Sequence, residues 1–500
     1  MCTLRRTLRR TALALFAVVL CTAFCWAYLI SGKENGAPAA LPFALGFGAL
    51  FVLAGRALQR APEERAQRVF RIALPLTAAA YVAASVWFMH TYRYTPVWDP
   101  DAVFTGAQNW LAGSLTSRST PTFDAQTYFY YFPNNLGATF VLRGWFALTR
   151  GWDPYIAACA LNCVLSTGMI LCAGGAAREL GGARMGLLAL LVLGCTLPLW
   201  FSCAAFYTDF LSICFPVGAL FFALRAERAA SLRTKALLWT AAGVMAALGA
   251  MIKITVLIMP IALVLWQLLR GKWRAALGLA LAAGLLFALG QFVLHKSLYP
   301  SQLDPQRAAQ MNTPVQHWVM MGLRGDGAYN PQDYAFTRSF ADAREAKAAI
   351  NGEIVRRIGE LGPAGFLRHL ARKTGIALSD GTLMLSDYYD DAPAAPQWLQ
   401  ELLLPGGENY GLWRAACNGV HMAQLALALL GCVRQLRRGG EEPGGAMYLA
   451  LPGLLLFLSL WETSRRYWIN FLPVLVLCAA QGALGRNGKR IGKDGAEVVY

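Results

Sequence analysis

The sequence predicts an all-α, polytopic membrane protein with about twelve transmembrane helices. Hydrophobic residues make up 56% of its 500 residues and charged residues only 15%, a balance typical of multispan membrane proteins. Apolar runs long enough to cross a bilayer recur along the chain, and short clusters of Lys and Arg separate them. The formal net charge of +17 therefore indicates membrane topology and not nucleic-acid binding.

Residues 1–90 are predicted to form three N-terminal spans. A basic segment precedes the first apolar run, which is about 20 residues long and so exceeds the core of a signal peptide. Further runs follow near 41–56 and 70–90, and the Arg-rich segment between them is expected on the cytoplasmic side. The third span would then deliver the next loop, residues 91–153, to the outer face of the membrane.

Residues 134–150 are apolar enough to resemble a further span, but the charge distribution predicts a helix on the outer surface. If this run crossed the membrane, the basic loops near 177–185, 225–235 and 268–274 would lie outside, against the positive-inside rule. If the run lies on the surface, each of these loops is cytoplasmic. Arg143 in its middle agrees, because an arginine at mid-bilayer costs about 2.5–3.5 kcal/mol on translocon scales.

The remaining apolar runs complete the predicted architecture. Residues 154–294 would form a six-span core, and residues 295–410 an external loop that caps the membrane surface, with helical patterning around 337–376. Residues 411–500 would supply three C-terminal spans and a basic tail, which places both termini in the cytoplasm and the protein in the inner (cytoplasmic) membrane. The spans after the first loop are expected at 154–174, 185–205, 208–224, 235–252, 254–270, 274–294, 411–432, 446–461 and 467–484.

The first external loop opens with two carboxylates at the start of a short amphipathic helix. Asp99 fits the N-cap position, Pro100 the first helical position and Asp101 the first turn. Apolar side chains then recur at helical spacing, at Val103, Ala107, Trp110 and Leu111. Two such acids could serve only to cap the helix and to complement its dipole. The other residues expected on the outer face favour a functional role.

Ionisable and aromatic side chains from several distant segments are predicted to gather on this outer face. Lys253, Arg465 and Arg466 could be interfacial anchors, but on the outer face they oppose the positive-inside trend. Cations kept there indicate an anionic partner, and a phosphate held at membrane depth fits best. Besides the two acids, the set comprises the run from Tyr128 to Asn135 with Tyr131 and Asn134, and also Tyr207, Thr208, Asp209, Lys253, His317, Trp318, Asp326, Tyr329, Asp333, Lys373, Asp380, Gly381, Glu462, Arg465, Arg466 and Tyr467.

The order of these features resembles the GT-C superfamily of integral-membrane glycosyltransferases, close to the bacterial glycosyltransferase family 39 and protein-mannosyltransferase group. The resemblance implies a mannosyltransferase-like hexosyltransferase of the cell envelope that uses polyprenyl-phosphate-linked sugars as donors. The surface helix at 134–150 would correspond to the juxtamembrane helix of that fold. The resemblance extends over residues 97–475 and rests on Asp101 followed by Ala107, Leu111 and Gly113, on the aromatic run ending in Pro133-Asn134-Asn135, on Tyr207-Thr208-Asp209, and on Glu462, Arg466 and Tyr467 followed by Pro473.

The residue types suit this chemistry. Transfer from a lipid-phosphate sugar needs a base for the acceptor hydroxyl and a cation for the departing phosphate. Asp99 is the first candidate for the base and Asp101 the second, while Asp209 would orient the acceptor. The candidates for substrate binding are Lys253, Arg465 and Arg466 at the phosphate, Glu462 and Tyr467 beside them, His317 and Trp318 at the sugar, and Tyr131 and Asn134 in the aromatic segment.

Cofactors and partners follow from the same residues. Asp99 and Asp209 could share a divalent cation, because carboxylate oxygens suit Mg²⁺ or Mn²⁺. The expected partners are a polyprenyl-phosphate-linked sugar donor, membrane lipid, and an acceptor that is a glycan, a lipid or a protein.

Two other functions fit parts of the sequence. About twelve helices with both termini inside would suit a secondary transporter or a flippase for lipid-linked saccharides. Against this, the acids lie at the ends of spans and in external loops and not at mid-membrane. An O-antigen-type ligase or polymerase would suit the large late loop, whereas the acids of the first loop favour the transferase.

Overall fold

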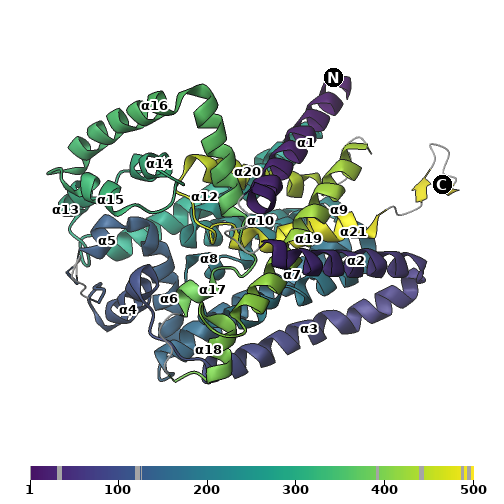
Figure 1. The fold of residues 1–500 in the computed structure, drawn as a ribbon, viewed down its shortest axis with the longest axis horizontal. Coiled ribbons are helices and arrows are strands. Elements are labelled where there is room, and N and C mark those ends of the chain that lie inside the picture. Colours follow the sequence, from purple (N-terminus) through teal and green to yellow (C-terminus); the bar gives the residue numbers. More distant parts are fainter. Residues whose placement is uncertain are drawn as a thin grey trace.

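The computed structural model describes residues 2–30, 37–118, 124–125, 127–389, 394–437, 444–485, 489–491 and 497–499. Over these residues the chain is helical, apart from a two-stranded antiparallel hairpin near its end, β1 (Lys489–Ile491) and β2 (Glu497–Val499). The predicted all-α class is confirmed. Long helices make up one part of the molecule, and a second part of shorter helices lies at one end of them (Figure 1).

Eight helices in the described part of the chain are long and apolar enough to cross a membrane. Three shorter apolar stretches accompany them, so the predicted count of twelve is not confirmed. The long ones are α1 (Cys2–Phe24) with η1 (Cys25–Ile30), α2 (Ala37–Arg60), α3 (Glu63–Thr91), α7 (Pro154–Gly194), α8 (Thr208–Leu211) with α9 (Cys214–Arg228), α10 (Leu232–Ile252), α12 (Trp273–Leu298) and α19 (Tyr410–Arg437). The shorter ones are η4 (Ile254–Leu257) with α11 (Ile258–Leu269), α20 (Gly445–Leu460), and η5 (Ile469–Phe471) with α21 (Leu472–Leu484).

The spans predicted at 154–174 and 185–205 take a different form in the structure. The first span and about half of the second belong to the 41-residue α7, which kinks at Gly181 and Gly182. Gly182 has φ 75°, a left-handed conformation that favours glycine, and the Glu63 carboxylate accepts a hydrogen bond from the Ala183 amide at 2.9 Å just beyond the kink. The end of the predicted second span is the 3₁₀ helix η3 (Leu197–Ala204).

Burial separates central helices from peripheral ones. The most apolar window of the α8–α9 span is 83% buried in the protein, whereas those of α2 and α12 are only 17% buried. The exposed side chains of α12 form a stripe of leucines that suits contact with lipid, at Leu277, Leu281, Leu285 and Leu289. In the centre, α19 and α21 approach closely at Gly482, where a Cβ would lie 1.8 Å from the Leu427 carbonyl oxygen.

The first loop forms a group of short helices that lies beside the long ones (Figure 1): α4 (Trp98–Ala112), α5 (Tyr128–Tyr131), η2 (Pro133–Asn135) and α6 (Leu136–Leu148). With 13 residues, α6 is about 20 Å long, too short to cross a hydrocarbon core of about 30 Å. Beyond α6, Asp153 at the start of α7 pairs with Arg93 at the end of α3, at 2.7 Å. Because these two span ends lie together, the chain between them returns to the side from which it left. The predicted surface helix at 134–150 agrees with this geometry.

The predicted N-cap role of Asp99 is wrong. The α4 helix begins at Trp98, its N-cap residue is Val97, and no side chain caps it. Asp99 lies inside the first turn, where its carboxylate instead accepts hydrogen bonds from the hydroxyl groups of Tyr128 and Tyr207. Tertiary contacts therefore decide the orientation of this acid.

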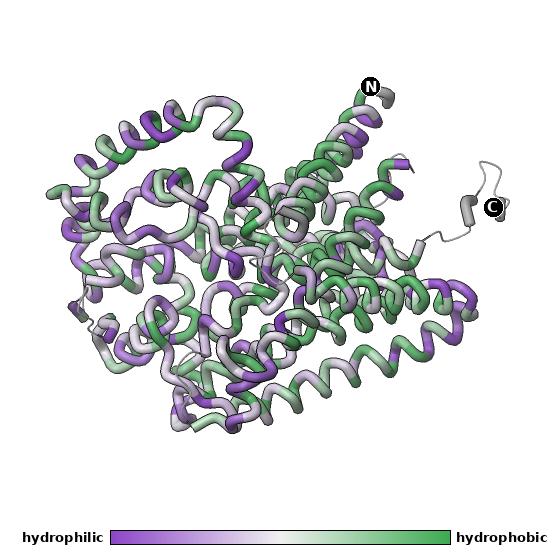
Figure 2. The backbone as a smooth tube through the Cα atoms, viewed as in Figure 1, coloured by the Kyte–Doolittle hydropathy of each residue, from purple (hydrophilic) through white to green (hydrophobic). Residues whose placement is uncertain are grey.

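The late loop folds into six helices, α13 (Pro305–Met311), α14 (Gln316–Gly322), α15 (Pro331–Arg338), α16 (Ala343–Ala377), α17 (Leu385–Tyr388) and α18 (Gln397–Leu403). The helical pattern predicted around 337–376 corresponds to α16, which kinks at Gly362, where φ is 61°. Hydrophilic residues follow one another along α16, whereas the long helices are mainly hydrophobic between their ends (Figure 2). The late loop thus has the polarity of a segment outside the bilayer.

Candidate active site

The candidate site lies at one end of the long helices, where segments of the first loop, the core and the late loop meet. The start of α4 and the aromatic segment of α5 and η2 contribute from the first loop. The chain between η3 and α8, the break between α10 and η4, and the turn between α20 and η5 contribute from the core. Charged side chains from these segments are in contact with one another through hydrogen bonds, ion pairs and aromatic rings.

Asp209 is the most buried acid of the site and is held by cations. It lies in the first turn of α8, and its side chain is only 1% exposed. Its Oδ1 atom pairs with Lys253 Nζ, and its Oδ2 atom lies 3.6 Å from Arg466 Nε. The Tyr388 hydroxyl donates to the same Oδ2 atom at 3.3 Å. One carboxylate thus faces two cations, which leaves a net positive charge in this trio.

The two cations reach Asp209 because the helices end there. α10 stops at Ile252, and Lys253 has extended backbone angles before η4 begins. The Lys253 ammonium also lies 4.7 Å from the centroid of the Tyr467 ring. Arg466 belongs to the non-helical turn after α20, and its guanidinium lies 5.1 Å from the centroid of the Tyr207 ring. Aromatic faces therefore support both positive charges in addition to Asp209.

Asp99 is held differently, by hydroxyl groups alone. Tyr128 donates to Oδ1 at 2.6 Å, and the Tyr207 hydroxyl lies 3.3 Å from Oδ2. Asn135 fixes both tyrosines, because its amide nitrogen donates to Tyr128 at 2.6 Å and its amide oxygen lies 3.1 Å from the Tyr207 hydroxyl. Within the described residues no cation lies within ion-pair distance of Asp99, and the residue is partly exposed. Its carboxylate therefore contacts hydroxyl groups and forms no ion pair among the described residues.

The residue before Asp99 has a strained backbone. Trp98 has φ 55°, a left-handed conformation that costs an L-residue about 1–2 kcal/mol, and its side chain is 83% exposed. Such strain persists only where the surrounding structure fixes the chain, and it concentrates at functional sites. Here the surroundings include the hydrogen bonds that hold Asp99 in place.

Glu462 and Lys373 are two buried ionisable residues between the site and the late loop. Burial raises the pKa of Glu462 to about 7, although the positive charge of Arg466 opposes this shift. The Tyr467 hydroxyl donates to the Glu462 carboxylate at 3.3 Å. Burial lowers the pKa of Lys373 to about 7, and its ammonium donates to the carbonyl groups of Ser459 and Trp461. Both groups therefore change charge near neutral pH.

Several predicted site residues lie outside this cluster. Asp101 is buried and pairs with Arg118 at 3.3 Å, and burial raises its pKa against the effect of that arginine. Arg465 is exposed, and so is Asn134, whose amide reaches only the neighbouring Asn135 at 3.4 Å. Tyr131 packs under the guanidinium of Arg338, 3.5 Å from the ring centroid.

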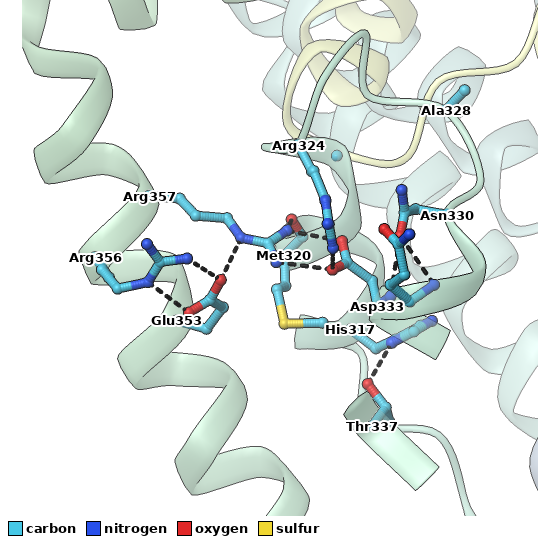
Figure 3. A network of polar contacts seen from close by, with 12 residues as sticks. His317, Met320, Arg324, Ala328, Asn330, Asp333, Thr337, Glu353, Arg356 and Arg357 are labelled. Carbon is cyan, nitrogen blue, oxygen red and sulfur yellow. Dashed lines mark hydrogen bonds and ion pairs between the residues drawn. The ribbon is translucent and has the colours of Figure 1, made fainter. Parts of the chain in front are cut away.

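His317 belongs to a network that holds the late loop together (Figure 3). Its Nδ1 atom and the Thr337 hydroxyl are 2.6 Å apart, and burial lowers the pKa of His317 to about 4, so the ring is neutral at physiological pH. Beside it, Asp333 of α15 accepts two hydrogen bonds at 2.7 Å from Arg357 of α16. These contacts join α14, α15 and α16. The contacts of His317 therefore support a structural role in the late loop.

Trp318 faces the site more closely than His317 does. Its ring centroid lies 6.3 Å from that of Trp461 and 6.3 Å from that of Phe132. Phe132 in turn lies 5.1 Å from Tyr128, the partner of Asp99. A row of partly exposed rings thus leads from the late loop toward Asp99.

Four further residues of the cluster were expected on the outer face, but no role at the site was predicted for them: Tyr128, Asn135, Tyr207 and Lys373. Tyr388 was not predicted. It comes from the late loop, and no pattern in the sequence shows that it reaches Asp209.

The fit of a divalent cation can be tested on the donor groups. Both oxygens of Asp209 already face positive groups, Lys253 and Arg466, which would repel a second cation. In the part of the chain that the structure describes, no group of three or more His, Cys, Asp or Glu residues could hold a metal ion. Asp99 and Asp209 therefore do not fit a shared metal site, and no catalytic step is derived through one.

A comparison with protein families decides the class of the chain. A family model described as "Conserved hypothetical integral membrane protein" matches residues 13–483. The chain belongs to this family. The integral-membrane character predicted from composition is thereby confirmed for this family member. No curated protein matches the chain.

Two solved structures are similar to this family member. One is the archaeal oligosaccharyltransferase AglB from Archaeoglobus fulgidus, in complex with an inhibitory peptide and a dolichol-phosphate, with 13% identity and a TM-score of 0.43. The similarity covers 82% of this chain and 50% of AglB, so the chain spans about half the length of that enzyme. The other is ArnT from Cupriavidus metallidurans bound to undecaprenyl phosphate, with 16% identity and a TM-score of 0.38, covering 82% of this chain and 77% of ArnT.

Both TM-scores lie below 0.5 and both identities below 25%.

Proposed function

We propose that the protein is a glycosyltransferase that moves a sugar from a polyprenyl-phosphate-linked donor to an acceptor at the extracytoplasmic face of the membrane. One observation carries this proposal. Asp99, a carboxylate held only by hydroxyl groups, shares Tyr207 with Arg466. Arg466 and the second cation, Lys253, are both mostly buried and both pair with one carboxylate, Asp209. A candidate base, Asp99, and two candidate phosphate-binding residues, Arg466 and Lys253, thus lie in one site at the end of the membrane helices.

The phosphate-binding residues are Arg466 and Lys253. Both contact Asp209 and both are mostly buried, with side chains 24% and 12% exposed. Placing two cations in such a site is unfavourable without sufficient negative charge. A lipid phosphate would supply the missing charge, and the planar guanidinium of Arg466 can donate two parallel hydrogen bonds to its oxygens. The polyprenyl chain would then extend along the membrane-facing helices.

The base is Asp99. Transfer breaks the bond between the anomeric carbon of the sugar and the phosphate oxygen, and the electron pair leaves with the polyprenyl phosphate. The acceptor hydroxyl oxygen forms the new bond to the anomeric carbon, and its proton passes to the Asp99 carboxylate. Arg466 and Lys253 stabilise the negative charge that develops on the departing phosphate. Asp209 keeps these two cations in position, which is the role that its contacts support best.

Transfer of radiolabelled sugar tests the proposal. Membranes that contain the protein are incubated with a radiolabelled polyprenyl-phosphate hexose, and label that leaves the lipid fraction is counted. We expect label to move to a product in the presence of the wild-type protein and not with Asp99→Asn. A transporter or flippase would leave the label on the lipid, and that result would contradict transfer.

The orientation in the membrane belongs to the same proposal, with the site outside and both termini in the cytoplasm. Tyr329 and Val315 of the late loop are 59% and 63% exposed, and Leu232, near the opposite end of the long helices, is 83% exposed. In intact cells, Tyr329→Cys and Val315→Cys should react with an impermeant thiol reagent above the wild-type background. Leu232→Cys should react only after the cells are permeabilised. The reverse pattern would place the site in the cytoplasm.

A further inference from the structure

A cavity lies far from the candidate active site, at the other end of the long helices. Its volume is about 500 Å³, within the usual size range of ligand sites. Side chains of α3, α7 and α9 line it, among them Gln67, Arg178 and Arg228. The cavity adjoins the first turns of α3, whereas the active site adjoins its last residues. Because α3 has 29 residues, these ends are about 43 Å apart.

The cavity carries an excess of positive charge. Three arginines line it, Arg178, Arg225 and Arg228, against two glutamates, Glu63 and Glu179. Arg225 and Arg228 share Glu179, at 3.8 and 3.2 Å.

The two remaining charged residues of the lining, Glu63 and Arg178, differ in whether an oppositely charged residue pairs with them. Glu63 is already paired outside the lining with Arg184, at 3.1 Å, and accepts from the Ala183 amide. Arg178 has no acidic partner within ion-pair distance among the described residues. When the Gln67 amide is turned so that its oxygen faces the arginines, that oxygen accepts from Arg178 at 3.2 Å. Arg178 is thus oriented by a neutral group, and its charge is uncompensated.

Apolar side chains connect the cavity to the lipid-facing surface. Phe70 and Leu74 of α3, Leu171 of α7 and Phe221 of α9 belong to the lining. Leu171 is 43% exposed, and Ile72 on the neighbouring turn of α3 is 58% exposed. The site therefore combines a cationic end with an apolar exit toward the bilayer. A soluble anion would use only the first of these features, whereas a lipid would use both.

We propose that this cavity binds the phosphate headgroup of an anionic membrane lipid. Arg178, together with Arg225 and Arg228, would contact the phosphate oxygens through charge-assisted hydrogen bonds. An acyl chain would leave the cavity along Leu171 and Phe221. Because α3, α7 and α9 together form the cavity, the bound lipid would stabilise their packing at this end.

Thermal unfolding of the full-length protein in detergent tests this site. Phosphatidylglycerol is added in increasing amounts, with phosphatidylcholine and glycerol 1-phosphate as parallel ligands. We expect a saturable rise in Tm with phosphatidylglycerol, because a ligand that binds only the folded state stabilises it. Neither the zwitterionic lipid nor the headgroup without chains should reproduce the effect. An equal rise with phosphatidylcholine, or with glycerol 1-phosphate alone, would overturn the proposal.

A matched pair of variants locates the effect. Arg178→Gln removes the uncompensated charge without breaking an ion pair, and it should weaken the apparent affinity for phosphatidylglycerol about tenfold. Arg68→Gln removes an equal charge from an exposed position of α3 that does not line the cavity, and it should leave the affinity unchanged. If both variants bind phosphatidylglycerol like the wild-type protein, or if both weaken it equally, the cavity is not the site.

Discussion

Asp99 and Asp209 are two aspartates of one site, yet they differ in exposure and in the kind of group that holds the carboxylate. Asp99 is partly exposed and held by two tyrosine hydroxyls, while Asp209 is almost fully buried and held by Lys253 and Arg466. Asp209 is therefore engaged in ion pairs, whereas Asp99 faces only neutral hydroxyl groups. The proposed roles, proton transfer for Asp99 and charge balance for Asp209, follow from these partners and not from the residue type.

The largest effect on activity is expected at Asp99. Asp99→Asn keeps the shape of the side chain, and its single amide oxygen can still accept a hydrogen bond from one of the two tyrosines, but it cannot take a proton at neutral pH. Loss of a positioned base lowers rates by about 10²–10⁴-fold, so kcat in the sugar-transfer assay should fall by that factor. Thermal unfolding of the purified variant should remain close to that of the wild-type protein, because no buried cation loses its partner.

Asp101 provides the matched control, two residues along the same helix. Its carboxylate pairs with Arg118 and not with the tyrosines. Asp101→Asn should therefore affect kcat far less than Asp99→Asn does. If the two variants lose activity to the same extent, the assignment of the base to Asp99 is wrong.

Asp209→Asn should change stability in addition to activity. It leaves Lys253 and Arg466 buried without a counter-charge, and breaking a buried ion pair typically costs about 3–5 kcal/mol. The midpoint of thermal or chaotrope-induced unfolding in detergent should therefore fall clearly. The double variant Asp209→Asn with Lys253→Met should recover part of the loss. A variant as stable as the wild-type protein would show that the trio is not a balanced charge cluster.

Arg466→Lys sharpens the comparison on the cation side. Lysine keeps the positive charge but lacks the planar fork that can hold two phosphate oxygens. Loss of a charge-assisted hydrogen bond worth about 1.5–3 kcal/mol should raise the KM for the polyprenyl-phosphate donor roughly ten- to a hundredfold. Arg465→Lys is the control, since Arg465 is exposed next to it and should leave KM unchanged. A silent Arg466→Lys variant would favour an interfacial anchor, for which lysine serves equally well.

The smallest effect is the pH dependence that Glu462 confers. Burial raises its pKa from 4.5 to about 7, so the folded protein binds more protons than the unfolded chain between these values, and its stability falls as pH rises through that window. Above pH 7 the deprotonated Glu462 adds a negative charge near Arg466. The donor KM of the wild-type enzyme should therefore rise by a few-fold, about 1 kcal/mol, between pH 6 and pH 8.

Glu462→Gln removes this titration, so the donor KM should become nearly independent of pH over the same range. Lys373 is the other group that titrates there, since burial lowers its pKa to about 7. Lys373→Met should retain the rise in KM if Glu462 is its source. A rise that persists in Glu462→Gln and disappears in Lys373→Met would assign the pH dependence to the lysine.

The sequence by itself determined the class of the molecule, and it supplied a prediction of its topology. Hydrophobic length and the distribution of Lys and Arg depend on the bilayer as a solvent, and both act on each segment separately. The surface helix at 134–150 was predicted in this way, because one wrong span would have placed several basic loops outside. The same reasoning brought Asp209, Lys253, Glu462 and Arg466 to one end of the helices, where the structure places them in contact or in electrostatic range.

Only the tertiary structure decided which partners surround each acid. The local pattern around Asp99 is that of a helix cap, and nothing local distinguishes it from Asp101. The distinction arises because Tyr128, Asn135 and Tyr207 come from other segments and surround Asp99, whereas Asp101 turns toward Arg118. Lys373 and Tyr388 likewise reach the site from a loop whose position no hydropathy pattern fixes. Side-chain partners that are distant in sequence are set by packing between segments, and composition and periodicity carry no information about that packing.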